Sequence, residues 1–442
     1  MKVLLISTNR LKPTPTSQWL PVEPLGLAYI AAGLRNAGHE IQLLDLCFVE
    51  QQDAAIVGLV EKFAPDVIGI SLRNIEMMAY FQNISFLDEL GSTVNICRHH
   101  SDAKIILGGS GFSIMPAQIL RFSGLDLGIV GEGERSLPEL LSRLELGQDY
   151  SDIPGVVQVV GDRVLFAPPD RNQDISTLLT PARDLIDHSR YVEAGGTANL
   201  QTKRGCPFKC IYCTYPLIEG TVVRCRRPDE VADEFRLLNS AFGVKEVYVV
   251  DNQFNYPLDH AKEVCEKLVD LRDEVKIWWS CMLNPGHLSE ELVLLLRLAR
   301  CVMVDLGIES ASDKVLSSLG KNFGTGEIRN AINLLRKYRL PFSTWILLGG
   351  PGETKETVRE TLEFLVESEV PSVLFSIGLR VCPGTRIEQL MRGEGKLGKA
   401  DELLDPVFYL SMSAEELAEL VLPYCRGRKG WRIAAFEHPD EN

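Results

Sequence analysis

The sequence predicts an α/β protein with two successive parallel sheets. A doubly wound N-terminal domain is followed by a partial (β/α)6 barrel and a small C-terminal helical extension. Two observations support this prediction. Short apolar runs alternate with helix-like segments over residues 1–140, and a second alternation with six expected strands occupies residues 196–390. Strands that alternate with helices favour parallel sheets, and a length of 442 residues suits two or three domains.

The first alternation is expected to form a Rossmann-like sheet. Its expected strands are residues 2–7, 40–46, 66–72, 103–109 and 127–134, and its clearest helices are residues 26–38 and 53–64. Ligands of doubly wound sheets bind outside the carboxyl ends of the strands. The loops that follow these strands are therefore the expected binding edge.

The rest of the chain is expected to form a linker, the barrel and the extension. Residues 141–195 contain Pro- and Asp-rich stretches and are predicted to be a linker with a small hairpin. The expected barrel strands are residues 197–203, 246–251, 276–282, 301–308, 342–349 and 372–381. Chemistry in such barrels lies at the carboxyl ends of the strands. Residues 391–442 are predicted to be a helical extension, with its clearest helix at 413–425.

Composition and charge exclude several classes of protein. The formal net charge of −14 argues against a nucleic-acid-binding surface, which needs clustered Lys and Arg. No apolar run approaches the ~18 residues that span a bilayer, and the N-terminal apolar stretch is too short for a signal peptide. We therefore expect a cytoplasmic protein whose eleven cysteines are mostly reduced.

Three cysteines are crowded into the segment QTKRGCPFKCIYCTYP. Cys206, Cys210 and Cys213 have spacings of four and three residues, and no histidine lies near them. A structural zinc site takes four ligands, usually as two pairs. Three thiolates instead suit three irons of a [4Fe–4S] cluster and leave the fourth iron open for a substrate or cofactor.

This motif resembles the signature of the radical S-adenosylmethionine (SAM) family, which has an aromatic residue before the last cysteine, here Tyr212. The resemblance implies that the open iron holds SAM and that one electron cleaves SAM to methionine and a 5′-deoxyadenosyl radical. The segments DLGIES, LLGGPGET and GLRVCPGT resemble the SAM-binding strand ends of the family. The SAM-binding residues that this implies are Tyr212, Glu309, Ser310, Gly349, Gly350 and Arg380. The family's glycine-rich motif after the second strand is missing, and VDNQFNYP at 250–257 stands in its place.

The first 140 residues are similar to the cobalamin-binding domain of cobalamin-dependent radical SAM enzymes. The similarity lies in the segments PLGLAYIAAGLRNAGHEIQLLD, DVIGISLRN, IILGGSGFS and GIVGEGE. It implies that glycine-lined strand ends hold the corrinoid. The cobalamin-binding residues that we expect are Arg73, Asn74, Gly108, Gly109, Ser110, Gly111, Phe112, Gly131, Glu132 and Gly133.

One departure concerns the lower face of the corrin ring. Cobalamin domains of the methionine-synthase kind place a cobalt-binding histidine after the first strand, but the loop STNRLKPTPTSQW at 7–19 contains none. We expect Arg73 or Asn74 beneath the corrin instead. A Rossmann-like domain that binds no cofactor is the alternative.

The two resemblances together imply a methyltransferase that moves a methyl group from SAM, by way of cobalamin, to an unactivated carbon or phosphorus atom. The expected partners are a small-molecule or peptide substrate and an external electron donor such as flavodoxin or ferredoxin. One alternative keeps all three cofactors but performs cyclisation, ring contraction or rearrangement. Another is an iron–sulfur electron-transfer or redox-sensing protein without SAM.

Two further groups of residues are candidates for substrate contact. Arg224, Arg226 and Arg227 form a basic run that suits a carboxylate or phosphate, with a surface run as the alternative. Trp278 and Trp279 alternate on the third barrel strand, so only one of them can face the barrel interior.

Overall fold

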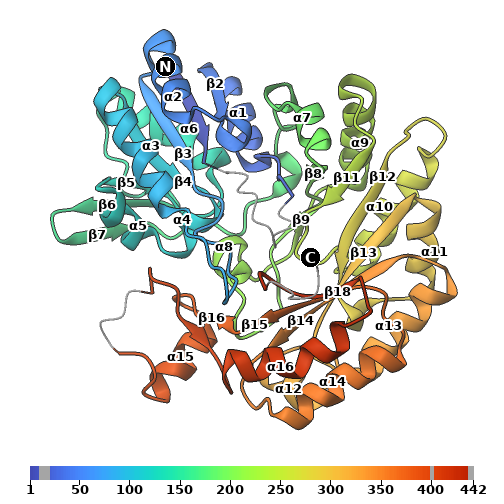
Figure 1. The fold of residues 1–442 in the computed structure, drawn as a ribbon. Helices are drawn as coiled ribbons and strands as arrows, with labels where there is room; N and C mark the ends of the chain where they lie inside the picture. The colour runs from blue at the N-terminus through green and yellow to red at the C-terminus, as the bar shows by residue number, and fades with distance from the viewer. Residues whose placement is uncertain (9–19, 399–402, 437–442) are drawn as a thin grey trace.

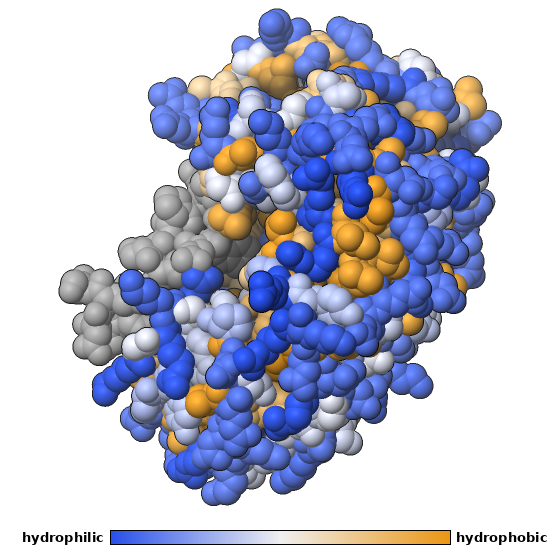
Figure 2. Space-filling model, turned by 90° about the vertical axis from the view of Figure 1, so that its right-hand side faces the viewer, coloured by the Kyte–Doolittle hydropathy of each residue, from blue (hydrophilic) through white to orange (hydrophobic). Residues whose placement is uncertain are grey.

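The computed structural model describes residues 1–8, 20–398 and 403–436. Two α/β units lie side by side, with the N-terminal unit at the upper left of Figure 1 and the barrel unit at the right and below. No helix among these residues is long and apolar enough to cross a membrane. The surface in Figure 2 is mainly hydrophilic, with hydrophobic side chains confined to smaller patches.

Within the described residues, the first sheet has seven strands in the order β2–β1–β3–β4–β5–β6–β7. Its strands are β1 (Lys2–Ser7), β2 (Glu40–Asp45), β3 (Val67–Ser71), β4 (Lys104–Gly108), β5 (Leu127–Ile129), β6 (Val156–Val160) and β7 (Arg163–Phe166). Its helices are α1 (Leu25–Asn36), α2 (Gln52–Phe63), α3 (Leu87–His100), α4 (Ser110–Ile114), α5 (Pro116–Ser123) and α6 (Gly133–Glu145). Strands β1 to β5 are parallel, which confirms the predicted doubly wound sheet.

Alternating residues of these strands build two cores, one on each face of the sheet. Leu4 and Ile6 belong to a core with side chains of α2, α3 and α5. Val3 and Leu5 point the other way and pack with side chains of α1 and α6. Because successive side chains of a strand point to opposite faces, a strand buried on both faces reads as a continuous apolar run.

The segment expected to be a linker takes part in the fold. Its hairpin, β6–β7, joins the first sheet through antiparallel pairing of β6 with β5. Residues 141–145 belong to α6. The segment continues through short 3₁₀ turns at Ile175–Thr177 and Arg183–Leu185 and through α7 (His188–Glu193). Further 3₁₀ turns lie at Leu46–Phe48 and Pro285–His287. The domain boundaries at 140 and 195 stay a prediction.

The second sheet has seven parallel strands among the described residues, in the order β18–β15–β14–β13–β12–β11–β8. They are β8 (Ala198–Leu200), β11 (Glu246–Val249), β12 (Trp278–Leu283), β13 (Cys301–Glu309), β14 (Phe342–Leu348), β15 (Val373–Ile377) and β18 (Trp431–Ile433). The helices of this unit are α8 (Tyr215–Glu219), α9 (Pro228–Phe242), α10 (Leu258–Asp270), α11 (Glu290–Leu298), α12 (Asp313–Ser318), α13 (Thr325–Lys337), α14 (Lys355–Glu367), α15 (Arg386–Gly393) and α16 (Ala414–Cys425). Helices α9 to α14 and α16 lie outside the sheet, as Figure 1 shows.

The structure refines three of the expected elements. The first barrel strand is divided into β8 and β9 (Lys203–Arg204), and β9 pairs with β10 (Arg224–Cys225). The sixth is also divided, because Gly378 adopts a positive φ of 79° between β15 and β16 (Leu379–Arg380). β16 pairs with β17 (Phe408–Tyr409). The extension is not purely helical, since β17 and β18 both come from it.

Candidate functional site

The three cysteines lie in the loop that connects β9 to α8. This loop begins at Gly205, where φ is +91° and a Cβ atom would lie 2.1 Å from the carbonyl oxygen of Val222. Only glycine fits such a position without strain. The amide of Cys206 donates to the carbonyl of Gly220 (3.0 Å), and the amide of Cys213 donates to that of Cys210 (3.3 Å). The backbone of the cysteine loop is therefore held in one conformation.

The environment of the thiols suits a metal cluster. Burial raises the pKa of Cys206, Cys210 and Cys213, in the last case to about 12. The positive charge of Lys321 lowers the pKa of each of these thiols and so opposes the rise. A bound metal deprotonates its thiol ligands outright. Among the described residues, no three His, Cys, Asp or Glu side chains converge in the way a single metal ion needs. A [4Fe–4S] cluster takes one thiolate per iron, so it fits this donor set better than zinc does.

Tyr212 and Glu309 meet beside the cysteine loop. Glu309 ends β13 with a positive φ of 59°, which is uncommon for a residue other than glycine and typical of functional sites. The Tyr212 hydroxyl donates to Glu309 Oε1 at 3.0 Å. Lys321, which the sequence analysis missed, lies 2.7 Å from Glu309 Oε2. The carboxylate expected to contact SAM is thus fixed by two donors.

The next strand end presents backbone N–H groups. Gly349 and Gly350 follow β14, and both amides donate to the Glu353 carboxylate, the second at 3.3 Å. Ser310 is turned into the core, where its hydroxyl lies 3.2 Å from that of Thr361. Gly349, Gly350 and Glu309 thus lie at the ends of two neighbouring strands, while the Ser310 side chain supports the turn.

Arg380 is occupied by partners of its own. Its guanidinium forms a buried ion pair with Glu76, from the loop after β3, and also donates to the carbonyls of Val381 and Leu403. This side chain therefore joins the N-terminal unit to the antiparallel pair β16–β17. A single-sequence motif does not reveal such a partner 304 residues away.

Glu353 gives a prediction about pH. Burial raises its pKa from about 4.5 to about 7, although the two glycine amides oppose the rise. The proton is bound more tightly in the folded chain, so it adds stability below pH ~4.5 that is lost as the pH rises to about 7. At ~1.4 kcal/mol per pKa unit, this loss amounts to about 3 kcal/mol.

We expect Glu353→Gln, which is neutral at every pH, to remove that decline in the free energy of unfolding. Urea titrations of both proteins at several pH values between 4.5 and 7.5 will measure it. Glu356→Gln, at an exposed side chain three residues later, serves as the control and keeps the decline. An unchanged decline in the Glu353 variant would contradict the assignment.

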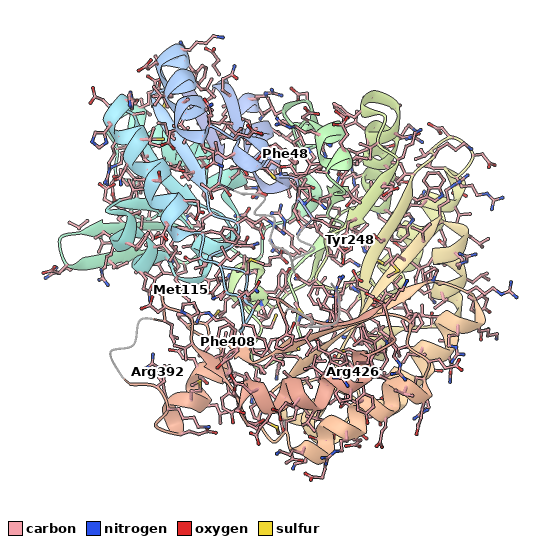
Figure 3. The ribbon with its side chains drawn as sticks, viewed as in Figure 1. Phe48, Met115, Tyr248, Arg392, Phe408 and Arg426 are labelled. Carbon is pink, nitrogen blue, oxygen red and sulfur yellow. The ribbon has the colours of Figure 1, made fainter. Side chains whose placement is uncertain are left out.

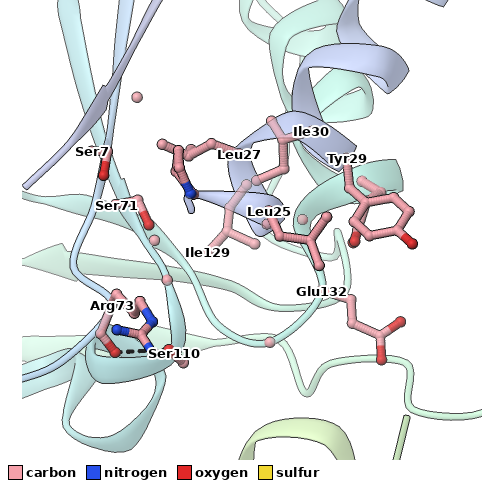
Figure 4. A pocket seen from close by; sticks show the side chains of 18 of the residues that line it. Ser7, Leu25, Leu27, Tyr29, Ile30, Ser71, Arg73, Ser110, Ile129 and Glu132 are labelled. Carbon is pink, nitrogen blue, oxygen red and sulfur yellow. Dashed lines mark hydrogen bonds between the residues drawn. The ribbon is translucent and has the colours of Figure 1, made fainter. Parts of the chain in front are cut away.

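The N-terminal unit contains a cavity of about 320 Å³ at the carboxyl ends of its strands. Apolar side chains of α1 and β5, among them Leu25, Leu27, Ile30 and Ile129, point into it (Figure 4). Of the residues expected to bind cobalamin, those that line the cavity are Arg73, Gly108, Gly109, Ser110, Gly131, Glu132 and Gly133. A hollow with apolar walls and glycine backbone suits the nucleotide tail of a corrinoid.

Arg73 lies at the edge of this cavity with its charge unmatched. Its carbonyl accepts a hydrogen bond from the Ser110 hydroxyl at 2.7 Å (Figure 4). No described residue forms a hydrogen bond or ion pair with its guanidinium, and burial lowers the pKa of this group. Arg73 is half-buried, and a cation partly withdrawn from water without a partner is costly. The cavity therefore suits a ligand that brings polar or anionic groups to Arg73.

Three residues expected to contact cobalamin do not line the cavity, namely Asn74, Gly111 and Phe112. Phe112 is fully buried in the core beneath the sheet. Gly111 packs against the backbone of Leu72 and Asn74. The part of the loop after β1 that lies at 9–19 falls outside the described residues.

The cavity and the cysteine loop adjoin one another. Tyr215, Ile218 and Glu219 of α8, which begins two residues after Cys213, line the cavity of the N-terminal unit. Helix α8 also contacts α4, which follows β4. Gln201 and Arg204, just before the cysteine loop, line the same cavity, so residues on both sides of the loop border it.

Buried ion pairs hold the two units together at this point. Glu132 pairs with Arg204 at 3.1 Å and with Arg224, and Glu134 pairs with Arg204 at 2.6 Å. Arg226 pairs with Glu234 of α9 at 2.6 Å. Arg224 and Arg226 are therefore structural in the described chain, whereas Arg227 is exposed and pairs only with Glu230.

The sheet face that points away from the helices forms the inner surface of the barrel. Tyr248 on β11 donates to Asp305 Oδ2 at 2.8 Å, and Ser343 on β14 donates to Asp305 Oδ1 at 2.5 Å. Tyr248 lies near the middle of the molecule in Figure 3. Trp279 is buried against the helices, and Trp278 is 45% exposed on the opposite face. Trp278 is therefore on the face that forms the barrel interior and Trp279 on the face that packs against the helices, as the alternation of side chains along a strand requires.

Two family models match the chain. The B12 binding domain matches residues 20–141, and the radical SAM superfamily matches residues 200–365. The first match covers strands β2 to β5 of the first sheet and the helices between them. The second covers the cysteine loop and the strands from β9 through β14.

Known methyltransferases share most of this architecture. An uncharacterized methyltransferase of Pyrococcus horikoshii is 25% identical over 95% of this chain and 91% of its own length. Tryptophan 2-C-methyltransferase of Streptomyces laurentii is 25% identical, covering 86% of this chain and 73% of its own. The radical SAM methyltransferase TsrM of Kitasatospora setae, solved with tryptophan and a SAM analogue, is 26% identical with a TM-score of 0.80 over 89% of this chain and 76% of TsrM. TsrM with cobalamin and a [4Fe–4S] cluster shares the fold at a TM-score of 0.87, with 22% identity over 100% of this chain and 92% of TsrM.

Proposed function

Because the chain is a radical SAM enzyme with a B12-binding domain, we propose that it transfers a methyl group from SAM to a carbon or phosphorus atom of a small molecule. Its cofactors are a [4Fe–4S] cluster, SAM and cobalamin. The observation that carries the proposal is the position of α8, which follows the cysteine loop and lines the cavity of the N-terminal unit. The methyltransferases that match both units support it.

Each part of the chain has a separate task in this proposal. When bound, the cluster supplies one-electron chemistry to SAM, and the corrinoid carries the methyl group. Cys206, Cys210 and Cys213 would hold the cluster, and Glu309 with the glycine backbone after β14 would contact SAM. The cavity beside α1 would take the nucleotide tail of the corrinoid, and Arg73 would contact the corrinoid from the edge of that cavity. An external electron donor, a flavodoxin or ferredoxin, reduces the cluster, and the setting is cytoplasmic.

The test starts from the chain purified without oxygen and loaded with iron, sulfide and hydroxocobalamin. We expect about one corrinoid per chain, because a single B12 binding domain matches the chain and one cavity in it suits the corrinoid tail. With SAM and a strong one-electron reductant, we expect S-adenosylhomocysteine to form in proportion to bound corrinoid. Retained corrinoid with 5′-deoxyadenosine but no S-adenosylhomocysteine would favour rearrangement chemistry over methyl transfer. A cluster spectrum that does not respond to SAM would favour simple electron transfer.

A cavity-filling variant tests the corrinoid site. Leu25 is buried at the start of α1 and points into the cavity (Figure 4). Overpacking such a site costs ~1–3 kcal/mol, so Leu25→Trp should weaken retention of hydroxocobalamin about tenfold. Desalting followed by absorption spectroscopy will count the corrinoid.

Leu146→Trp is the matched control, because Leu146 is 66% exposed after α6 and distant from the cavity lining. It should retain corrinoid as the unchanged chain does. Equal retention in the Leu25 and Leu146 variants would place the corrinoid elsewhere.

A further inference from the structure

Lys321 is a buried lysine beside the cysteine loop. It lies between α12 and α13, and its side chain is 5% exposed. Its ammonium nitrogen lies 2.7 Å from Glu309 Oε2, 3.3 Å from the Tyr212 hydroxyl and 3.9 Å from Cys210 Sγ. A thiol of the cluster, a carboxylate and a phenol therefore share one cation.

Aromatic rings shield this cation from water. The ammonium lies 5.8 Å from the ring centre of Tyr212 and 5.3 Å from that of Phe323. Charges interact far more strongly where water is excluded than on the surface. A lysine placed here acts on its neighbours with little screening by solvent.

The contact with Cys210 brings the charge of Lys321 to one of the three thiols expected to hold the cluster. The ammonium nitrogen and Cys210 Sγ are 3.9 Å apart, within hydrogen-bond reach of a sulfur atom. A cation therefore lies directly beside an expected cluster ligand.

The potential of an iron–sulfur cluster depends on nearby charge and on hydrogen bonds to its sulfurs. Reduction adds one electron to the cluster, and the external donor loses that electron. The reduced cluster thus carries one more negative charge than the oxidised cluster. A cation close to one of its sulfur ligands stabilises the reduced form.

We propose that Lys321 is a positioning residue that raises the reduction potential of the [4Fe–4S] cluster through its contact with Cys210 and that fixes the Glu309 carboxylate. The proposal rests on the proposed function, because that function requires the cluster. It assigns a role to a residue outside the cysteine motif and the SAM-binding strand ends. The ammonium eases electron entry before SAM is cleaved.

The test is a redox titration of the cluster in the full chain, followed by electron paramagnetic resonance in the absence of SAM. In Lys321→Met, we expect the ratio of reduced to oxidised cluster at a fixed potential to fall about tenfold, which equals a shift of about 59 mV for one electron. Lys321→Arg keeps the charge and should stay close to the unchanged chain. Lys314→Met removes an exposed lysine of α12 and should leave the potential unchanged.

Separate outcomes distinguish this proposal from the proposed function. If the unchanged chain takes up no cluster, the proposed function fails. If Lys321→Met carries a full cluster with the potential of the Lys314→Met control, the role of Lys321 is overturned. If circular dichroism shows that Lys321→Met is folded but the variant holds no cluster, the iron content of Lys321→Arg decides whether the charge of Lys321 matters. Loading in the arginine variant supports the role of the charge, and failure to load overturns it.

Discussion

Cys213→Ala is expected to give a folded chain that holds no intact [4Fe–4S] cluster and cleaves no SAM. In the proposed cluster each of the three thiolates would hold a different iron, so the variant would leave only two protein ligands and we expect the cluster to be lost. The fold should survive, because the loop backbone is fixed by hydrogen bonds of Cys206 to Gly220 and of Ile211 to Leu319, which do not involve the lost thiol. Iron and sulfide counts after anaerobic reconstitution, with the absorption spectrum, will measure the loss.

Cys225→Ala is the matched control for that experiment. Cys225 lies on β10, twelve residues after Cys213, and is the nearest further cysteine along the chain. Its electrostatic neighbours are Lys203, Asp251 and Glu263, none of which belongs to the cysteine loop. This variant should keep the cluster. Loss of iron from Cys225→Ala, or retention of a full cluster by Cys213→Ala, would contradict the ligand assignment.

Of the substitutions proposed for this chain, Arg183→Met is expected to lower the free energy of unfolding the most. The Arg183 guanidinium donates to Glu234 at 2.6 Å, to Glu23 at 3.3 Å and to the Asn199 carbonyl at 2.6 Å. Glu23 precedes α1, while Asn199 and Glu234 belong to the barrel unit, so this side chain joins the two units. Removing it leaves two buried carboxylates without their shared cation, although Glu234 keeps Arg226 and Glu23 keeps His188. We therefore expect a cost at the lower end of the range for a broken buried pair, about 3 kcal/mol. The urea midpoint, read by circular dichroism, will report the change.

An exposed ion pair one residue away provides the comparison. Arg35 donates to both carboxylate oxygens of Asp184, at 2.8 and 2.9 Å, with 39% and 57% of the two side chains exposed. Exposed pairs contribute ~0–1 kcal/mol, so Arg35→Met should change the free energy of unfolding by less than about 1 kcal/mol. If Arg35→Met and Arg183→Met lowered the free energy of unfolding by the same amount, burial of the ion pair would not determine its contribution to stability.

The strands of both sheets could be predicted because they carry strong local patterns. Residues 2–7 and 104–108 are apolar on both faces, and the helices between the strands show helical periodicity. The cysteine spacing is equally local, since Cys206, Cys210 and Cys213 fall within eight residues of one loop. These features depend on residues close together in the sequence, and a single sequence is enough to find them.

Features that depend on distant partners could not be predicted. Lys321 is near the cluster only because α12 brings the segment after it back to the cysteine loop, where Ile211 donates to Leu319. Arg380 follows a SAM-motif strand in the sequence, but its ion pair is with Glu76 of the other unit. Phe112 lies within a glycine-rich stretch that was expected to contact cobalamin, yet burial of its large ring places it in the core.

Short edge elements were missed for another reason. β18 has three residues, Trp431–Ile433, which is too few for a two-residue alternation to be recognised. The hairpin β6–β7 was expected, but its pairing with β5 was not, because its outer strand is largely exposed and shows no buried face.

The position of β18 has a consequence for biosynthesis. β18 pairs with β15, and 53 residues separate Ile377, the end of β15, from Trp431. Until Trp431–Ile433 leave the ribosome, one edge of β15 presents unpaired N–H and C=O groups, and such an edge recruits strands from other chains. Slow translation between β15 and β18 therefore prolongs the period in which nascent chains can aggregate. Synonymous codons that speed this stretch should raise the yield of folded protein.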